Sequence, residues 1–139
     1  MTLPNFMRTH LLSALATLKI GLDILTQTEQ LPVDRLYGHG GFFKTPEVVQ
    51  RLLSAAVGAP VSVMETAGEG GPYGMALLAA YMLRREEGET LEDYLDNKVF
   101  ANAKSSTLTA TDEDIAGFNA FLACYRKAFP LERLATEIL

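Results

Sequence analysis

Apolar residues recur at helical spacing along most of this chain. Between residues 6 and 25 they fall at steps of three and four, which places them on one stripe of a helix about 20 residues long. Pro32 excludes a continuation of that helix. The predicted stripe consists of Phe6, Met7, Leu11, Leu15, Leu18, Leu22 and Leu25.

Two short β-rich segments flank a second amphipathic helix. Val33–Tyr37 and Pro60–Met64 are typical of strands. Between them, Thr45-Pro46-Glu47 predicts a helix start, with a hydroxyl at the N-cap, proline at the first helical position and an acid in the first turn. Gly58 is placed to end the helix. The segments therefore predict a βαβ unit with parallel strands and a right-handed crossover.

Further helices follow this unit. A glycine-rich turn at 68–72 precedes a helix of small residues over Tyr73–Arg85, and two later helices each begin with a hydroxyl residue followed by an acid three positions on. Residues 101–110 read as a loop. The two caps are Thr90 with Asp93 and Thr111 with Asp114.

The pattern contains two strands among five or six helices. Two isolated strands do not make a stable sheet. Either the helices cover the strands or further strands come from outside these residues, which suggests a fragment of a larger domain.

Composition restricts the classes of function. With 139 residues, 48% of them hydrophobic, and a net charge of −5, we expect a single globular domain over 1–139 that binds neither nucleic acid nor acidic membranes. One cysteine and two histidines give no disulfide framework and no usual zinc site. No targeting or membrane-spanning segment is evident, so a cytoplasmic location is expected. Cys124 is expected to be a buried structural thiol.

The turn from Gly38 to Thr45 is the candidate site. It follows a strand and precedes a helix, where unpaired backbone N–H groups and the helix dipole favour anionic ligands. The spacing matches neither the P-loop nor the dinucleotide-binding glycine motif. A tight structural turn and a nucleotide-binding turn both remain open on this spacing alone.

Several spaced motifs together resemble the C-terminal half of the FGGY carbohydrate kinases. That family shows Gly-Gly-Gly-Ala-x-Ser, a later Gln, Gly-x-Pro-Val and Glu-x-x-Ala-Leu-Gly-Ala-Ala. The resemblance covers roughly residues 5–85, and the xylulose and ribulose kinases look nearest. The matching residues are Gly40 to Pro46, Gln50, Gly58 to Val61, Glu69 and Gly74 to Ala80.

The resemblance implies an actin-like, ribonuclease H-like ATPase fold in two halves, with ATP and Mg²⁺ as cofactors. The chain would be the mostly helical α/β nucleotide-side part. Gly40 and Gly41 would meet the nucleotide, and Thr45 matches a polar position near the ribose and adenine. Phe42 replaces the family's third glycine, so its ring could pack on adenine or fill the core. Gln50 and Glu69 match the motif without an assigned contact.

The resemblance also places the catalytic aspartate, the sugar pocket and the Mg²⁺-holding loops N-terminal to these residues. No catalytic or metal-binding residue is therefore assigned here, and the chain alone is expected not to phosphorylate a sugar. Its partners would be ATP and, through the missing half, a pentulose; the small-residue helix and open sheet edge suggest a homo-oligomer. The alternative is a free-standing, non-catalytic α/β module that binds a nucleotide or a protein.

Overall fold

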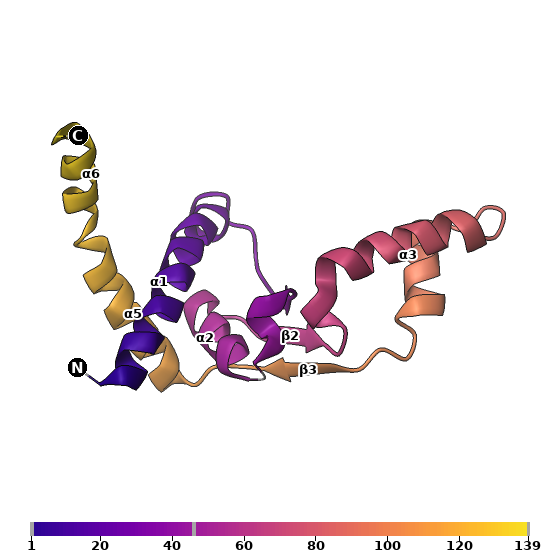
Figure 1. The fold of residues 1–139 in the computed structure, drawn as a ribbon, viewed down its shortest axis with the longest axis horizontal. Helices are drawn as coiled ribbons and strands as arrows, with labels where there is room; N and C mark the ends of the chain where they lie inside the picture. The colour runs from indigo at the N-terminus through magenta and orange to yellow at the C-terminus, as the bar shows by residue number, and fades with distance from the viewer. Residues whose placement is uncertain (1, 46, 139) are drawn as a thin grey trace.

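The computed structural model describes residues 2–45 and 47–138 (Figure 1). Most of these residues are helical, and three short strands form a small mixed sheet. In chain order the elements are α1 Leu3–Asp23, the π-helical η1 Ile24–Thr28, β1 Leu36–Gly38, the 3₁₀ helix η2 Gly41–Lys44, α2 Val48–Val57, β2 Val61–Met64, the 3₁₀ helix η3 Ala67–Glu69, α3 Gly70–Arg84, α4 Leu91–Tyr94, the π-helical η4 Leu95–Val99, β3 Ser105–Leu108, α5 Asp112–Arg126 and α6 Phe129–Ile138.

The predicted parallel βαβ unit is confirmed, although its first strand is shorter than expected. The sheet has the order β1-β2-β3, and β1 pairs in parallel with β2, with Leu36 opposite Val61. α2 connects the two strands. This unit places the turn after Gly38 at the carboxyl end of a parallel pair, where α/β sheets bind ligands.

The prediction of a loop over 101–110, and of only two strands, is wrong. Ser105–Leu108 forms β3, which pairs antiparallel with β2. Its first three residues are polar and exposed because β3 lies at the edge of the sheet, so the strand lacks an apolar alternation. The hydroxyls of Ser62 and Thr107 lie 2.7 Å apart across this pair. The third strand completes a sheet within the described residues.

The predicted start of α2 is also wrong. The helix begins at Val48, and its N-cap is Glu47 with φ 65° and no capping side chain. Thr45 has an extended backbone, because the 3₁₀ helix η2 has just ended at Lys44. The predicted N1 residue, Pro46, lies outside the described residues. At the other end Gly58 has φ 77° and donates to the carbonyl of Ser54 at 2.8 Å, which confirms its role.

The core lies where α2 packs against α1, α5 and the sheet. Buried Ser54 links these layers, because its hydroxyl donates to the Ala59 carbonyl at 2.9 Å and accepts from the Ala110 N–H at 2.8 Å. The capping box of Thr111 and Asp114 fixes the start of α5, as predicted. Burial of apolar surface in this cluster is the main stabilising contribution. The buried apolar members are Leu15, Ala16, Leu53, Ala55, Ala56, Val61, Ala110, Phe118 and Leu122.

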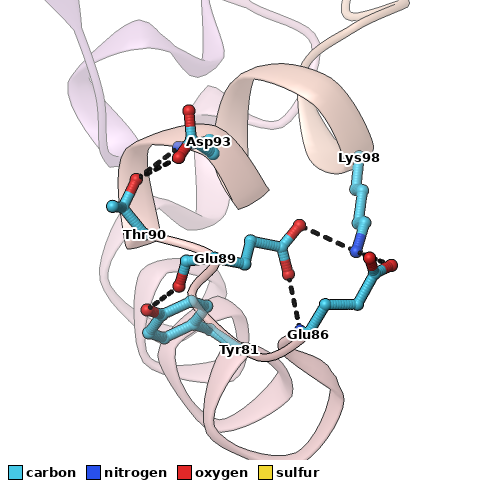
Figure 2. Close-up of polar contacts among 6 residues, drawn as sticks. All are labelled: Tyr81, Glu86, Glu89, Thr90, Asp93 and Lys98. Atoms are coloured by element: carbon cyan, nitrogen blue, oxygen red, sulfur yellow. Dashed lines mark hydrogen bonds and ion pairs between the residues drawn. The ribbon is translucent and has the colours of Figure 1, made fainter.

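Residues 70–104 form an arm that projects away from this core (Figure 1). None of the described residues of α3 is buried. At the tip, the Tyr81 hydroxyl donates to the carbonyl of Glu89 at 2.8 Å, and Lys98 lies 2.7 Å from a carboxylate oxygen of both Glu86 and Glu89 (Figure 2). The Tyr81 ring also packs edge-on against buried Tyr94 of α4, with ring centroids 5.5 Å apart. Polar contacts and this one aromatic pair therefore join α3 to α4.

The two C-terminal helices run one after the other away from the sheet (Figure 1). α5 ends at Arg126, and Pro130 lies in the first turn of α6. Cys124 is exposed, so the expectation of a buried thiol is wrong. Among the described residues, no helix combines the length and apolar character needed to cross a membrane.

Candidate functional site

The candidate turn between β1 and α2 is shaped by glycines with different requirements. Gly40 has φ 95° and ψ 179°, a conformation that side chains disfavour strongly. At Gly38 a Cβ atom would lie 2.3 Å from the ring of Phe43, so this ring occupies the space a side chain would need. Gly41 has neither constraint: its φ is not positive, and a Cβ there would meet nothing within 4 Å.

Some of the backbone donors of the turn are already used within the protein. The Gly40 N–H donates to the Ala67 carbonyl at 2.6 Å, and the Phe43 N–H donates to the Gly40 carbonyl at 3.0 Å. The N–H groups of Gly41 and Phe42, the first two residues of η2, make no hydrogen bond to a described residue. The open donors of the turn are therefore at Gly41 and Phe42 rather than at Gly40.

The second glycine-rich segment packs against this turn. A Cβ atom on Gly70 would lie 3.0 Å from the Cβ of His39, so the start of α3 approaches the turn closely. Lys44 Nζ lies 2.9 Å from Glu69 Oε1. The hydrogen bond from Lys44, together with its charge, lowers the pKa of the Glu69 carboxyl. Glu69, which had no assigned contact, thus joins the two glycine segments.

Beside the turn lies a hollow of about 440 Å³ between η2, β2 and β3. Of the four predicted site residues, Thr45 lines this hollow, whereas Gly40, Gly41 and Phe42 lie on the adjoining turn and do not line it. The lining residues are Phe43, Thr45, Glu47, Gln50, Val63, Met64, Glu65, Lys104, Ser105 and Ser106.

Gln50, the other unassigned motif residue, holds the floor of this hollow. Its side chain is buried, and its Nε2 donates to the carbonyl of Val61 at 2.7 Å and to that of Ser106 at 2.9 Å. The Ser106 hydroxyl donates back to Gln50 Oε1 at 3.4 Å. Both amide hydrogens are engaged, so Gln50 supports the hollow rather than offering a free donor to a ligand.

The sequence did not predict the side of the hollow that faces Thr45, which we call its far wall. Lys104 and Ser105 belong to the segment expected to be a loop, and β3 brings them opposite Thr45. Together with Glu47 and Glu65, the ammonium group of Lys104 gives the hollow a mixed charge. A hollow with two carboxylates suits a neutral group that carries hydroxyls better than it suits a triphosphate.

The Phe42 ring does not fill the core, because 40% of the residue is exposed. It lies edge-on to Phe43, with ring centroids 6.0 Å apart. Phe43 itself packs against the core. Of the two roles considered for Phe42, filling the core is wrong, and packing on adenine stays a prediction.

The described residues contain no cluster of three or more His, Cys, Asp or Glu side chains that would hold a metal ion. The acidic residues at the tip of the arm are occupied differently: Lys98 donates to Glu89 and thereby lowers the pKa of its carboxyl. Within the described residues, therefore, no preformed cluster of side chains would hold Mg²⁺.

These elements define a partial α/β domain in which a glycine turn joins a parallel strand to a helix beside a hollow. The model of the C-terminal domain of the FGGY family of carbohydrate kinases matches residues 1–83, more than half of the chain. The chain belongs to this family. The resemblance and the predicted fold class, mostly helical α/β with one parallel βαβ unit, are confirmed, while the match does not distinguish xylulose or ribulose kinases. Searches of the curated proteins and of the solved structures found no significant match.

Proposed function

We propose that this chain is the nucleotide-side part of a cytoplasmic sugar kinase that transfers the γ-phosphate of ATP to a hydroxyl of a pentulose of the xylulose or ribulose type. Family membership supports a carbohydrate kinase. The nucleotide side is supported by the turn that follows β1, with its open N–H groups at Gly41 and Phe42.

The main support for this proposal comes from the surroundings of Gly41. The fold needs glycine at Gly40 for its positive φ and at Gly38 for the Phe43 ring. It does not need glycine at position 41, where a side chain would meet no protein atom within 4 Å. A glycine in open space next to free N–H groups is what close approach of a ligand to the backbone requires.

The two halves of the site suit the two ends of ATP. The N–H groups of Gly41 and Phe42 would face the phosphate end, since backbone donors hold phosphate without charge. The hollow lined by Thr45 and Glu47 would take the ribose and adenine, whose hydroxyl and amino groups can pair with carboxylate and hydroxyl oxygens. The exposed Phe42 ring lies on the adjoining turn and would pack against the nucleotide from outside the hollow.

In this proposal the described residues bind and orient ATP, and they do not perform the phosphoryl transfer itself. ATP supplies the transferred group when bound. No described aspartate lines the hollow to accept the proton of a sugar hydroxyl. The proposal places that base, the sugar pocket and the Mg²⁺ site on a part of the enzyme outside this chain. Half of a cleft should bind ATP weakly, in the millimolar range.

Amide NMR spectra of the chain titrated with ATP test the proposal. We expect the largest shifts at Gly41, Phe42 and Thr45. Gly41→Ala should abolish those shifts while leaving the unfolding midpoint nearly unchanged, because its Cβ meets only open space. The matched control is Gly71→Ala, which also adds a Cβ in open space but lies in α3; it should bind ATP as the wild type does.

Three results would contradict the proposal. The first is ATP shifts confined to other elements, and the second is equal binding by Gly41→Ala. The third concerns catalysis: turnover of D-xylulose or L-ribulose by the chain alone, above a protein-free blank, would show that a catalytic base is present in it. A coupled assay for ADP release measures that turnover directly.

A further inference from the structure

A groove runs over the core on the side formed by α1, α2 and α5. Two hollows, of about 530 and 240 Å³, share Arg8, Leu52 and Asp114 and together make up this groove. Apart from the charged residues its walls are mainly apolar, with Met7 and Leu11 from α1 among them. The α5 wall includes a glycine at which a Cβ would meet nothing within 4 Å, so another helix can approach there closely. We call this the α1–α2–α5 groove.

α6 has a helix face that fits such a groove. Leu131, Leu134, Ala135 and Ile138 fall at i, i+3, i+4 and i+7, which is the spacing of helix-in-groove anchors. Leu131, Leu134 and Ile138 are 69%, 51% and 74% exposed, so nothing within the described chain covers this stripe. Exposed apolar stripes of this kind mark interaction surfaces. The helix also lies outside residues 1–83, the region matched to the kinase family.

The charges of the two surfaces are complementary. Within the groove, Arg51 Nε donates to Asp114 Oδ2 at 2.6 Å, so these charges offset each other. Arg8 forms no ion pair with a described residue and leaves the groove positive.

On α6, Glu137 pairs with Arg133 at 3.1 Å. Glu132 flanks the apolar stripe and forms no ion pair with a described residue. The unpaired charge of α6 is therefore negative, opposite to the unpaired charge of Arg8 in the groove.

We propose that α6 of one copy of this chain docks into the α1–α2–α5 groove of a second copy, and the reverse, to form a symmetric dimer. The groove ends at Asp114, near the start of α5. α6 follows Arg126, the last residue of α5, which lies about 18 Å from Asp114 along that helix at 1.5 Å per residue. Figure 1 shows α6 continuing away from the core. A second copy can use both surfaces at once, because a two-fold axis pairs each stripe with the other groove.

Sedimentation equilibrium of the intact chain over a wide concentration range tests the dimer. We expect a reversible dimer, weakened by Leu134→Glu about tenfold for each of the two equivalent contacts, hence about a hundredfold. Leu134 is half exposed, so the variant should keep the wild-type circular dichroism spectrum. Thr136→Glu, which adds the same charge on the opposite face of α6, is the matched control and should dimerise nearly as the wild type does.

A charge exchange tests the orientation. Arg8→Glu should weaken the dimer, and Glu132→Arg in the same chain should restore most of the loss, because the exchange rebuilds the pair with reversed signs. Arg8→Gln with Glu132→Gln should not restore it. A rescue by the charge exchange alone is a result that a merely structural role of either residue would not give.

Cross-linking distinguishes docking of α6 into the groove of a second copy from docking into the groove of its own chain. In a Cys124→Ser background, a mixture of Met7→Cys and Leu134→Cys chains should form a mixed disulfide dimer, whereas Met7→Cys mixed with Thr136→Cys should not. Three results would overturn the proposal: a monomer at every concentration, a dimer indifferent to Leu134→Glu, or a chain carrying both Met7→Cys and Leu134→Cys that closes on itself at monomer mass.

Discussion

Gln50 lies 56 positions from Ser106 in the sequence, yet its Nε2 donates to the Ser106 carbonyl at 2.9 Å. The same nitrogen donates to the Val61 carbonyl at 2.7 Å. One buried side chain on α2 therefore holds β2 and β3 together at the floor of the hollow. The glutamine of the family motif has a structural task in this chain that spacing alone did not reveal.

Gln50→Leu should destabilise the chain by about 2–4 kcal/mol, since it leaves the buried carbonyl of Val61 and the part-buried carbonyl of Ser106 without their donor. The free energy of unfolding in urea, monitored by circular dichroism, measures this loss. The matched control is Gln27→Leu, which removes an exposed side-chain hydrogen bond to Asp23 at 3.2 Å and should change stability by less than about 0.5 kcal/mol. Equal effects of the two variants would contradict the structural role of Gln50.

Local rules predicted the helices well because their signals lie within a few residues of one another. Thr111 and Asp114 form the capping box expected from their spacing, and Gly58 ends α2 in the left-handed conformation. β3 was missed for the opposite reason. Its polar residues become a strand only through pairing with β2 and through Gln50, which are contacts far apart in the sequence.

The candidate site shows the same difference between local signals and contacts that are far apart in the sequence. The glycine turn and its place between strand and helix could be predicted, because strand, turn and helix are consecutive. The pairing of the Gly40 N–H with the Ala67 carbonyl could not, since it depends on how η3 returns to the turn. Lys104 reached the hollow only through the missed strand. The sequence therefore predicted where the glycine turn lies, but it did not predict the residues of β3 that line the hollow beside it.

The carboxyl of Glu69 should titrate below the ordinary pKa of a glutamate, because Lys44 donates a hydrogen bond to it and adds a favourable charge. A lowered pKa in the folded state stabilises the fold at pH values above the ordinary glutamate pKa. That contribution is lost as the pH falls through the lowered value. Carbon-detected NMR of the Glu69 side chain measures the titration. In Lys44→Met the pKa should return towards its ordinary value; an unchanged pKa would show that Lys44 is not the cause.

Gly38→Ala should destabilise the chain by about 1–3 kcal/mol, because the new methyl group would occupy the space of the Phe43 ring. In the double variant with Phe43→Leu, part of this cost should disappear, since the smaller side chain leaves room; urea unfolding of all four forms gives the coupling energy. The control is Gly74→Ala within α3, where a Cβ meets nothing within 4 Å. It should stabilise the helix by about 0.5–1 kcal/mol. Additive effects at Gly38 and Phe43 would contradict the clash.

The arm over residues 70–104 should open independently of the core, because none of the described residues of α3 is buried. Its tip is joined to α4 by polar contacts (Figure 2) and by the aromatic pair of Tyr81 and Tyr94, which lies within the arm. Hydrogen exchange measured by mass spectrometry should show faster exchange in α3 than in α2.

Tyr81→Phe removes the donor to the Glu89 carbonyl and should speed exchange in α3 and α4 several-fold while leaving α2 unchanged. Tyr125→Phe is the matched control, because it removes a hydroxyl from α5 that lies 3.1 Å from Thr17, outside the arm. Equal protection of α3 and α2, or acceleration of both by Tyr81→Phe, would mean that the arm and the core unfold as one unit.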